Sequence, residues 1–348
     1  MTDRRPTRQG DPDIGSQYGI TSDGGEPVER KVQRTGGSSY TVSLPKSWAQ
    51  TNGIEAGSSL FCYPHHDRLV LAPIPQEDVD RTIEIDVDEI GSETLPQRLI
   101  AAYAAGNDRI VVRSDTGVTT ADRNTTSQVI TSLSGIEIHT ETEREIVARS
   151  LLDASKVSLI QSLSQIRRIT LAMHCDAIEA VRENDDELAR SIARRDDDVD
   201  RLYTLISRQF HRGLVDVSEI DRLDLTRPET FSILYDARQL ERIADHAERI
   251  AAVASQQPDP PADPIADRID RLAEGARDVV VTALNGDPEA ALSRHDAVID
   301  GVESLDRALF ERGDPAAYRY GTVVESIRRT AEYGRNIAEN AIRMDLKR

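Results

Sequence analysis

Residues 240–251, LERIADHAERIA, form one amphipathic pattern that places Glu241 and Asp245 one helical turn apart on the same face. Two like charges at this spacing cost a helix about 0.2–0.5 kcal/mol. The pair therefore requires a solvated face, an arginine partner or a bound cation.

Helical periodicity extends over the second half of the chain. Beyond Ser150 the sequence contains long patterns of 3.6-residue period, interrupted by turn residues at 184–185, 213, 226–228, 257–261, 286–288 and 313–315. We expect six helices. The proline-rich stretch at 258–264 divides them into two similar three-helix bundles, residues 150–257 and 264–348.

Acidic pairs with the spacing of Glu241 and Asp245 recur in both halves. Asp196 and Asp200 repeat it in the first bundle, and Asp296 and Asp300 repeat it in the second. If the helices of the first bundle face each other, its four carboxylates converge. Carboxylate oxygens suit Mg, Mn, Fe or Ca, so a divalent or ferric ion is the expected cofactor.

The alternative for these acids is a hydrated surface balanced by arginine. Arg238, Arg242 and Arg249 flank the first bundle's acids, and Asp245 with Arg249 has the favourable i,i+4 orientation. The remaining metal-ligand types nearby, His174, Cys175 and His246, are expected to pack or cap.

The first half of the chain has a different organisation. Residues 1–27 have scarcely any apolar periodicity and predict a disordered arm. Residues 28–75 contain short strand patterns and one short helix. Residues 80–149 alternate strands with helices and predict a small α/β domain, with strands at 82–87, 109–114 and 136–141 and helices at 94–106 and from about 122.

The N-terminal β unit holds the one locally basic stretch. Arg30, Lys31, Arg34 and Lys46 can neutralise phosphates, while Gly36-Gly37 brings the hydroxyls of Ser38 and Ser39 close to DNA. The alternative is a unit that only dimerises and whose basic residues balance acids. Adjacent His65 and His66 point apart on a turn and predict no metal site.

Composition sets the chemical setting. The 348 residues carry a net charge of −18 with a mean hydropathy of −0.47, and four of the 43 basic residues are lysines. This balance is typical of halophilic proteins, in which salt screens acidic repulsion. Two distant cysteines and the lack of an apolar run of about 18 residues predict a cytoplasmic protein that does not insert into membranes.

Two resemblances follow from these motifs. Gly36-Gly37-Ser38-Ser39 followed by Leu44-Pro45-Lys46 resembles the AbrB/SpoVT/MazE DNA-binding domain. That resemblance implies a barrel made of swapped hairpins from two chains, and hence a homodimer or higher homo-oligomer that binds double-stranded DNA.

The two bundles, their acid pairs and LERIADHAERIA resemble the PhoU family of phosphate-uptake regulators, here of a halophilic archaeal type, over about 151–348. The resemblance implies metal clusters on each bundle and signalling to a phosphate transporter and its genes. The ligands it implies are Asp196, Asp200, Glu241, Asp245, Asp296 and Asp300, with Glu332 at the position equivalent to Asp245.

The second bundle departs from that pattern. Arg328 stands at the position equivalent to Glu241, four residues before Glu332. An arginine removes negative charge and can satisfy neighbouring acids through a bidentate ion pair in place of a metal.

Together these observations predict a multidomain, phosphate-responsive transcriptional regulator that is not an enzyme. Its N-terminal swapped-hairpin β-barrel is followed by an α/β domain and two helical bundles. One alternative is an adaptor that docks on the ATPase of a phosphate ABC transporter without binding DNA. Another is a metal-carboxylate catalyst, for which the sequence offers no nucleophile and base pair in a suitable context.

Overall fold

The computed structural model describes residues 27–37, 39–65, 68–73, 81–153, 156–312 and 315–346. The chain forms two compact units, Met1–Pro75 and Gln76–Arg348. Ser38, His66 and nearly all of the predicted disordered arm lie outside the described residues.

The first unit contains two antiparallel hairpins. β1 (Gln33–Thr35) pairs with β2 (Ser39–Thr41), and β3 (Leu60–His65) pairs with β4 (Arg68–Pro73), with α2 (Lys46–Thr51) between the hairpins. Gly36 supports the first turn with a positive φ of 68°, which is accessible to glycine at little cost. None of the described residues of this unit is buried.

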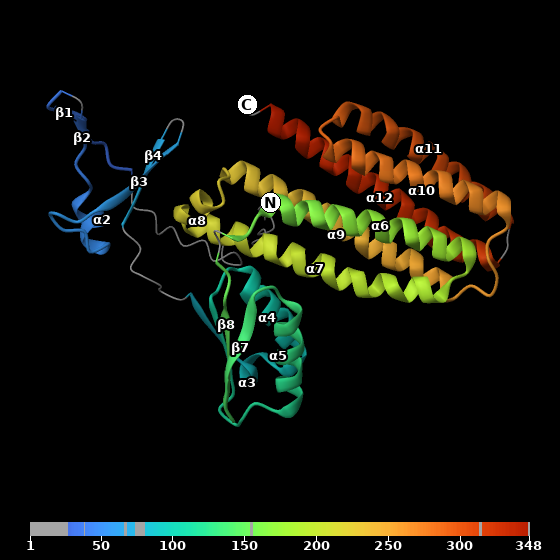
Figure 1. The fold of residues 1–348 in the computed structure, drawn as a ribbon, viewed down its shortest axis with the longest axis horizontal. Helices are drawn as coiled ribbons and strands as arrows, with labels where there is room; N and C mark the ends of the chain where they lie inside the picture. The colour runs from blue at the N-terminus through green and yellow to red at the C-terminus, as the bar shows by residue number, and fades with distance from the viewer. Residues whose placement is uncertain are drawn as a thin grey trace, which may run out of the picture. The chain divides into compact units, whose positions relative to one another are not determined.

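A four-stranded sheet begins the second unit (Figure 1). Its strands are β5 (Thr82–Asp86), β6 (Arg109–Arg113), β7 (Ile136–Glu141) and β8 (Glu145–Ser150) in the order β5-β6-β8-β7. Only β5 and β6 are parallel; β8 runs antiparallel to both of its neighbours. The sequence prediction lacked β8, whose buried Ile146, Val147 and Ala148 place it inside the sheet.

Helices cover this sheet through a small apolar core. They are α3 (Val87–Ile90), the 3-10 turn Ser92–Thr94, α4 (Leu95–Ala104) and α5 (Thr120–Ser132). Leu95, Leu99 and Tyr103 of α4 pack with Ile110 of β6 and Ile146 of β8. The Tyr103 hydroxyl donates a hydrogen bond to the Ser134 carbonyl at 2.6 Å, which satisfies the polar end of this buried ring.

The described remainder is helical and contains the six expected long helices. They are α6 (Leu159–Glu183), α7 (Asp186–Val215), α9 (Arg227–Ala254), α10 (Asp263–Leu284), α11 (Pro288–Arg312) and α12 (Pro315–Asp345). A short α8 (Val217–Arg222) follows α7, which continues through the predicted break at Gly213. Asn184, with φ 55°, ends α6, and a Thr226–Glu229 capping box begins α9.

The two groups of three helices lie side by side (Figure 1), and their buried side chains form one hydrophobic core. α9 packs against α6, α7 and α12, so it links the first group to the second. None of the helices in the described residues is long and apolar enough to cross a membrane. α4 also packs on α7, and this contact joins the α/β part to the helices.

Candidate functional site

The acids of the first bundle lie on two adjacent helices. Asp196 and Asp200 are on α7, and Glu241 and Asp245 are on the packed face of α9. Asp200 and Glu241 line one cavity, and the charges of Asp245 and Glu241 raise the pKa of Asp196, so the two pairs lie close together where α7 packs on α9.

Burial and mutual repulsion make two of these carboxyls weak acids. Burial raises the pKa of Asp196 to about 7, and the charges of Asp200 and Asp245 add to the shift. Burial likewise raises the pKa of Glu241 to about 7, although the Arg238 cation opposes the shift. Burial and Asp245 raise the pKa of Asp200. The site is therefore electrostatically unfavourable when all of its carboxyls are charged.

Arginine satisfies only part of this cluster. Arg238 pairs with Glu241, with Nη1 and Oε1 2.7 Å apart. Within the described residues, Oδ1 of Asp196 and Oε2 of Glu241 are buried without a hydrogen-bond partner, and Asp245 forms no ion pair with Arg249. Buried, unpaired carboxylate oxygens are costly, so they can accept a proton or a cation.

A cavity of about 290 Å³ gives access to two of the acids. Asp200 and Glu241 line it together with Arg201 and Arg238, while Ile100, Ser132 and Leu133 of the α/β part close its other side. Arg201 Nε donates a hydrogen bond to the Ser132 carbonyl at 2.9 Å. The acid cluster therefore opens toward the contact between the α/β part and the helices.

The second bundle arranges its acids differently. Asp296 is 83% exposed and contacts His295 Nδ1 at 3.0 Å, and Asp300 is exposed. Glu332 pairs with Arg329 at 2.8 Å. Arg328 pairs with Glu325 at 3.3 Å, outside the predicted ligand set, and among the described residues it does not pair with Asp296, Asp300 or Glu332.

No group of three or more His, Cys, Asp or Glu side chains in the described part of the chain is arranged to hold a metal ion. The expectation that two histidines pack is confirmed: His174 is buried beside Arg277 at 3.2 Å, and His246 contacts Ser326 Oγ at 3.2 Å. Cys175 is free and exposed.

The basic side chains of the first unit face solvent. Arg30, Lys31, Arg34 and Lys46 are all exposed, as is Ser39. Arg34 Nη2 donates to the Gly37 carbonyl at 3.2 Å, across the glycine turn. Residues 27–73 contain five basic and three acidic residues within a strongly acidic chain. Their placement leaves these cations free to meet a polyanion.

Sequence reasoning missed two acids and one arginine. Asp197 and Glu248 add to the charge that raises the pKa of Asp200. The missed arginine, Arg208 on α7, is buried beneath the α/β part, where Nη1 donates to the Asn107 carbonyl at 2.6 Å. Helical periodicity could have identified Glu248, because it lies three residues after Asp245 and so shares its face of the helix. No local signal distinguishes Arg208 from the other arginines.

Comparisons with known proteins agree with this division of the chain. Residues 163–254 match the PhoU domain family, and residues 33–78 match the family described as antidote-toxin recognition MazE, bacterial antitoxin. No curated protein matches the chain.

Two solved structures are similar to part of this chain. PhoU from Pseudomonas aeruginosa is 21% identical, with 55% of this chain and 96% of that chain covered and a TM-score of 0.45. The phosphate transport system regulatory protein PhoU from Streptococcus pneumoniae is 18% identical, with 55% and 94% covered and a TM-score of 0.45. By these two family matches, the helical part of this chain is similar to the PhoU domain over residues 163–254, and the N-terminal part is similar to the MazE family over residues 33–78.

Proposed function

We propose that the protein is a DNA-binding regulator of phosphate uptake that acts in the cytoplasm without catalysis. The PhoU match supports the phosphate role, and the MazE-family match supports DNA binding. The observation that carries the proposal is the exposed basic surface of the first unit, which contrasts with the net charge of −18 of the whole chain. Such a surface suits the phosphate backbone of duplex DNA.

The same unit supports a homodimer. Val32, Tyr40, Val42, Phe61 and Leu69 are exposed, and none of the described residues between 27 and 73 is buried. Two short hairpins without a core are at best marginally stable in water. A second copy of the unit would bury these side chains and place two basic surfaces on one DNA duplex.

The helical half would sense a cation or a phosphate-dependent partner. The described side chains are not grouped to hold a metal ion as they stand, but the unpaired oxygens of Asp196 and Glu241 are ligands of the type that a hard metal ion takes, and its charge would relieve the repulsion among four carboxylates. Mg, Mn, Fe and Ca share this preference for oxygen. Asp296, Asp300 and Glu332 offer a weaker site, since arginine and histidine already contact two of them.

The adaptor function remains the rival, with the first unit serving only to dimerise and the helices docking on a phosphate ABC transporter ATPase. The test is a titration of fluorescent duplex DNA with the full chain at several salt concentrations, followed by mapping of bound chromosomal DNA in high and low phosphate. We expect salt-dependent binding and phosphate-dependent occupancy. A chain without affinity for any duplex, even at the lowest salt at which it stays folded, would refute DNA binding and favour the adaptor.

A further inference from the structure

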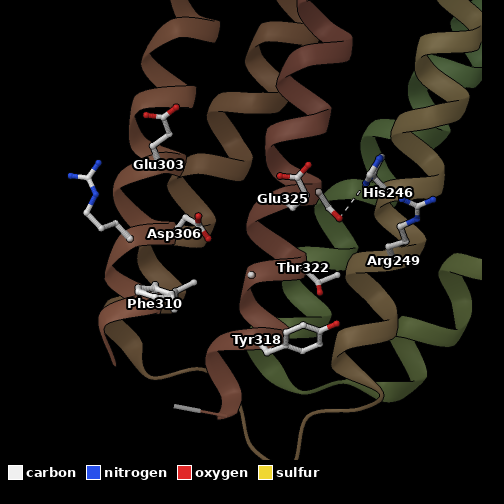
Figure 2. A pocket seen from close by; sticks show the side chains of 12 residues that line it. His246, Arg249, Glu303, Asp306, Phe310, Tyr318, Thr322 and Glu325 are labelled. Carbon is white, nitrogen blue, oxygen red and sulfur yellow. Dashed lines mark hydrogen bonds between the residues drawn. The ribbon is translucent and has the colours of Figure 1, made fainter. Parts of the chain in front are cut away.

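A second cavity lies between α9, α11 and α12, apart from the acid cluster (Figure 2). Its volume is about 930 Å³. Phe310 of α11 and Tyr318 of α12 stand at its edge, 87% and 85% exposed. Large aromatic rings beside a hollow of this size are typical of surfaces that bind another molecule.

Gly321 in the wall of this cavity is unlike the other helical glycines of the described chain. A Cβ built at Gly213, Gly275, Gly301 or Gly334 would come within 3 Å of a packed side chain, so the packing of the chain itself explains each of them. A Cβ at Gly321 meets nothing within 4 Å. Glycine weakens a helix interior relative to alanine, and the packing of this chain offers no compensation. Close approach by another backbone would explain Gly321.

The charges around the cavity are mixed. Arg249 and Arg307 lie near Glu303, Asp306 and Glu325, and neither arginine forms an ion pair within the described residues. His246 adds no charge near neutral pH, because burial and the Arg249 cation lower its pKa to about 4. Two copies of an acidic chain repel each other least where their charges balance locally.

From these observations we propose that the cavity is an interface with a second copy of this chain, in which the two α12 helices cross at Gly321. A twofold contact brings the same patch of both copies together and therefore needs a surface that complements itself. This patch carries both the hollow and the aromatic side chain that can enter it, Phe310. It also carries both members of an ion pair between copies, Arg307 and Asp306. This contact is separate from the dimer contact proposed for the first unit.

Disulfide trapping in the full chain tests the contact. In a Cys62→Ser, Cys175→Ser background, Gly321→Cys should form an intermolecular disulfide under mild oxidation, because helices crossing at a glycine bring their Cα atoms within disulfide reach. Ser293→Cys is the matched control, since Ser293 is exposed on α11 and does not line the cavity. We expect a several-fold higher yield at position 321.

Two further variants separate this contact from random collision. Phe310→Ala and Arg307→Glu, each added to Gly321→Cys, should lower the disulfide yield several-fold, while circular dichroism verifies that each variant is folded. The double variant Arg307→Glu, Asp306→Arg should restore the disulfide yield, because it swaps the positions of the two charges and so keeps an ion pair between the copies. Dimerisation through the first unit would raise the disulfide yields of Gly321→Cys and Ser293→Cys equally. The measurement contains no DNA, so its result does not depend on whether the protein binds DNA. Equal yields at positions 321 and 293, or a yield at 321 that neither variant lowers, would overturn the interface.

Discussion

Arg208 and Asp108 join the helices to the α/β part, with Arg208 Nη2 2.9 Å from Asp108 Oδ1. The arginine side chain is 1% exposed, and its guanidinium also donates to the carbonyls of Tyr103 and Asn107 and lies over the Tyr103 ring. Arg212, one turn further along α7, contacts Asp108 as well and pairs with Glu219 at 2.6 Å. α7 therefore carries both the acid pair Asp196/Asp200 and the anchor of the α/β part.

Replacement of Arg208 should destabilise the second unit strongly. Arg208→Ala removes the donor of the Asn107 carbonyl and one of two donors of the Tyr103 carbonyl, and leaves Asp108 with Arg212 as its ion-pair partner. We therefore expect the free energy of unfolding to fall by about 3 kcal/mol, the lower end of the range for breaking a buried pair. Denaturant unfolding at high salt measures it. Arg201→Ala is the control, because Arg201 on the same helix also bonds to the α/β part but is 40% exposed and should cost less than about 1 kcal/mol. Equal losses for the two variants would contradict the special position of Arg208.

Residues 151–348 alone should remain helical, since their apolar faces form one core. We expect a lower melting temperature than in the full chain, because the fragment lacks the partners of Arg208. Within the fragment, Arg208→Ala should have little effect on stability. Circular dichroism decides both points, and a disordered fragment would show that the helices need the α/β part to fold.

Loss of a basic side chain in the first unit should weaken DNA binding on every sequence. For Arg34→Ala and Lys46→Ala, each lost phosphate contact makes the slope of log affinity against log salt shallower by about one. Arg68→Ala tests whether basic residues beyond the predicted set contribute. Binding isotherms over a salt series give the slopes. Affinity and slope that match the wild type in both variants would remove these residues from the DNA surface.

Asp245→Asn should lower metal content in the first bundle. It should also lower the melting temperature in metal-replete buffer, because a bound cation stabilises the folded state by mass action. The metal-free variant should be as stable as the wild type or more so, since one of several repelling charges is gone. Glu332→Gln is the control and should change metal content less. Elemental analysis and melting curves at matched salt test this. If the wild type contains no metal and its melting curve is the same with and without added metal, these acids are only a solvated face of the helices.

Asp236 should make stability depend on pH. Burial raises its pKa to about 7, although Asn340 Nδ2 donates to it at 3.0 Å. Because the pKa of Asp236 is higher in the folded state than in the unfolded state, its contribution to the free energy of unfolding is complete at low pH. That contribution is lost as the pH rises from about 4 to 7. The free energy of unfolding of Asp236→Asn should equal that of the wild type at pH 4 and exceed it by about 2 kcal/mol at pH 8. This is about half of the free energy that corresponds to the full pKa shift, because the side chain is only partly buried. Unfolding free energies of metal-free protein across this range test it, and exposed Asp259→Asn should show no such trend.

Local signals in the sequence were sufficient for the six long helices and several of their ends, although not for the end of α7, which continues past Gly213. The break at Asn184 and the start at Thr226 depend on backbone conformation and capping within a few residues, and the structure places helix ends at both. The approach of Asp196 to Glu241 and Asp245 was predictable only in part. Helical period places each acid pair on one face, but the two faces meet because α7 packs against α9.

Long-range packing decided the rest. The β8 strand pairs with the neighbouring β7, but its place inside the sheet comes from its second partner, β6, more than thirty residues earlier, and local pattern carries no record of that partner. The second bundle repeats the acid spacing, yet Asp296 faces solvent while Glu332 pairs with Arg329, since the sequence specifies a helical face but not which face meets the neighbouring helix. Arg208 is one of 39 arginines, and only the position of the α/β part over α7 removes it from water. Sequence thus determined the long helices and their faces through local geometry, whereas tertiary contacts determined the position of β8 and which charges became buried or paired.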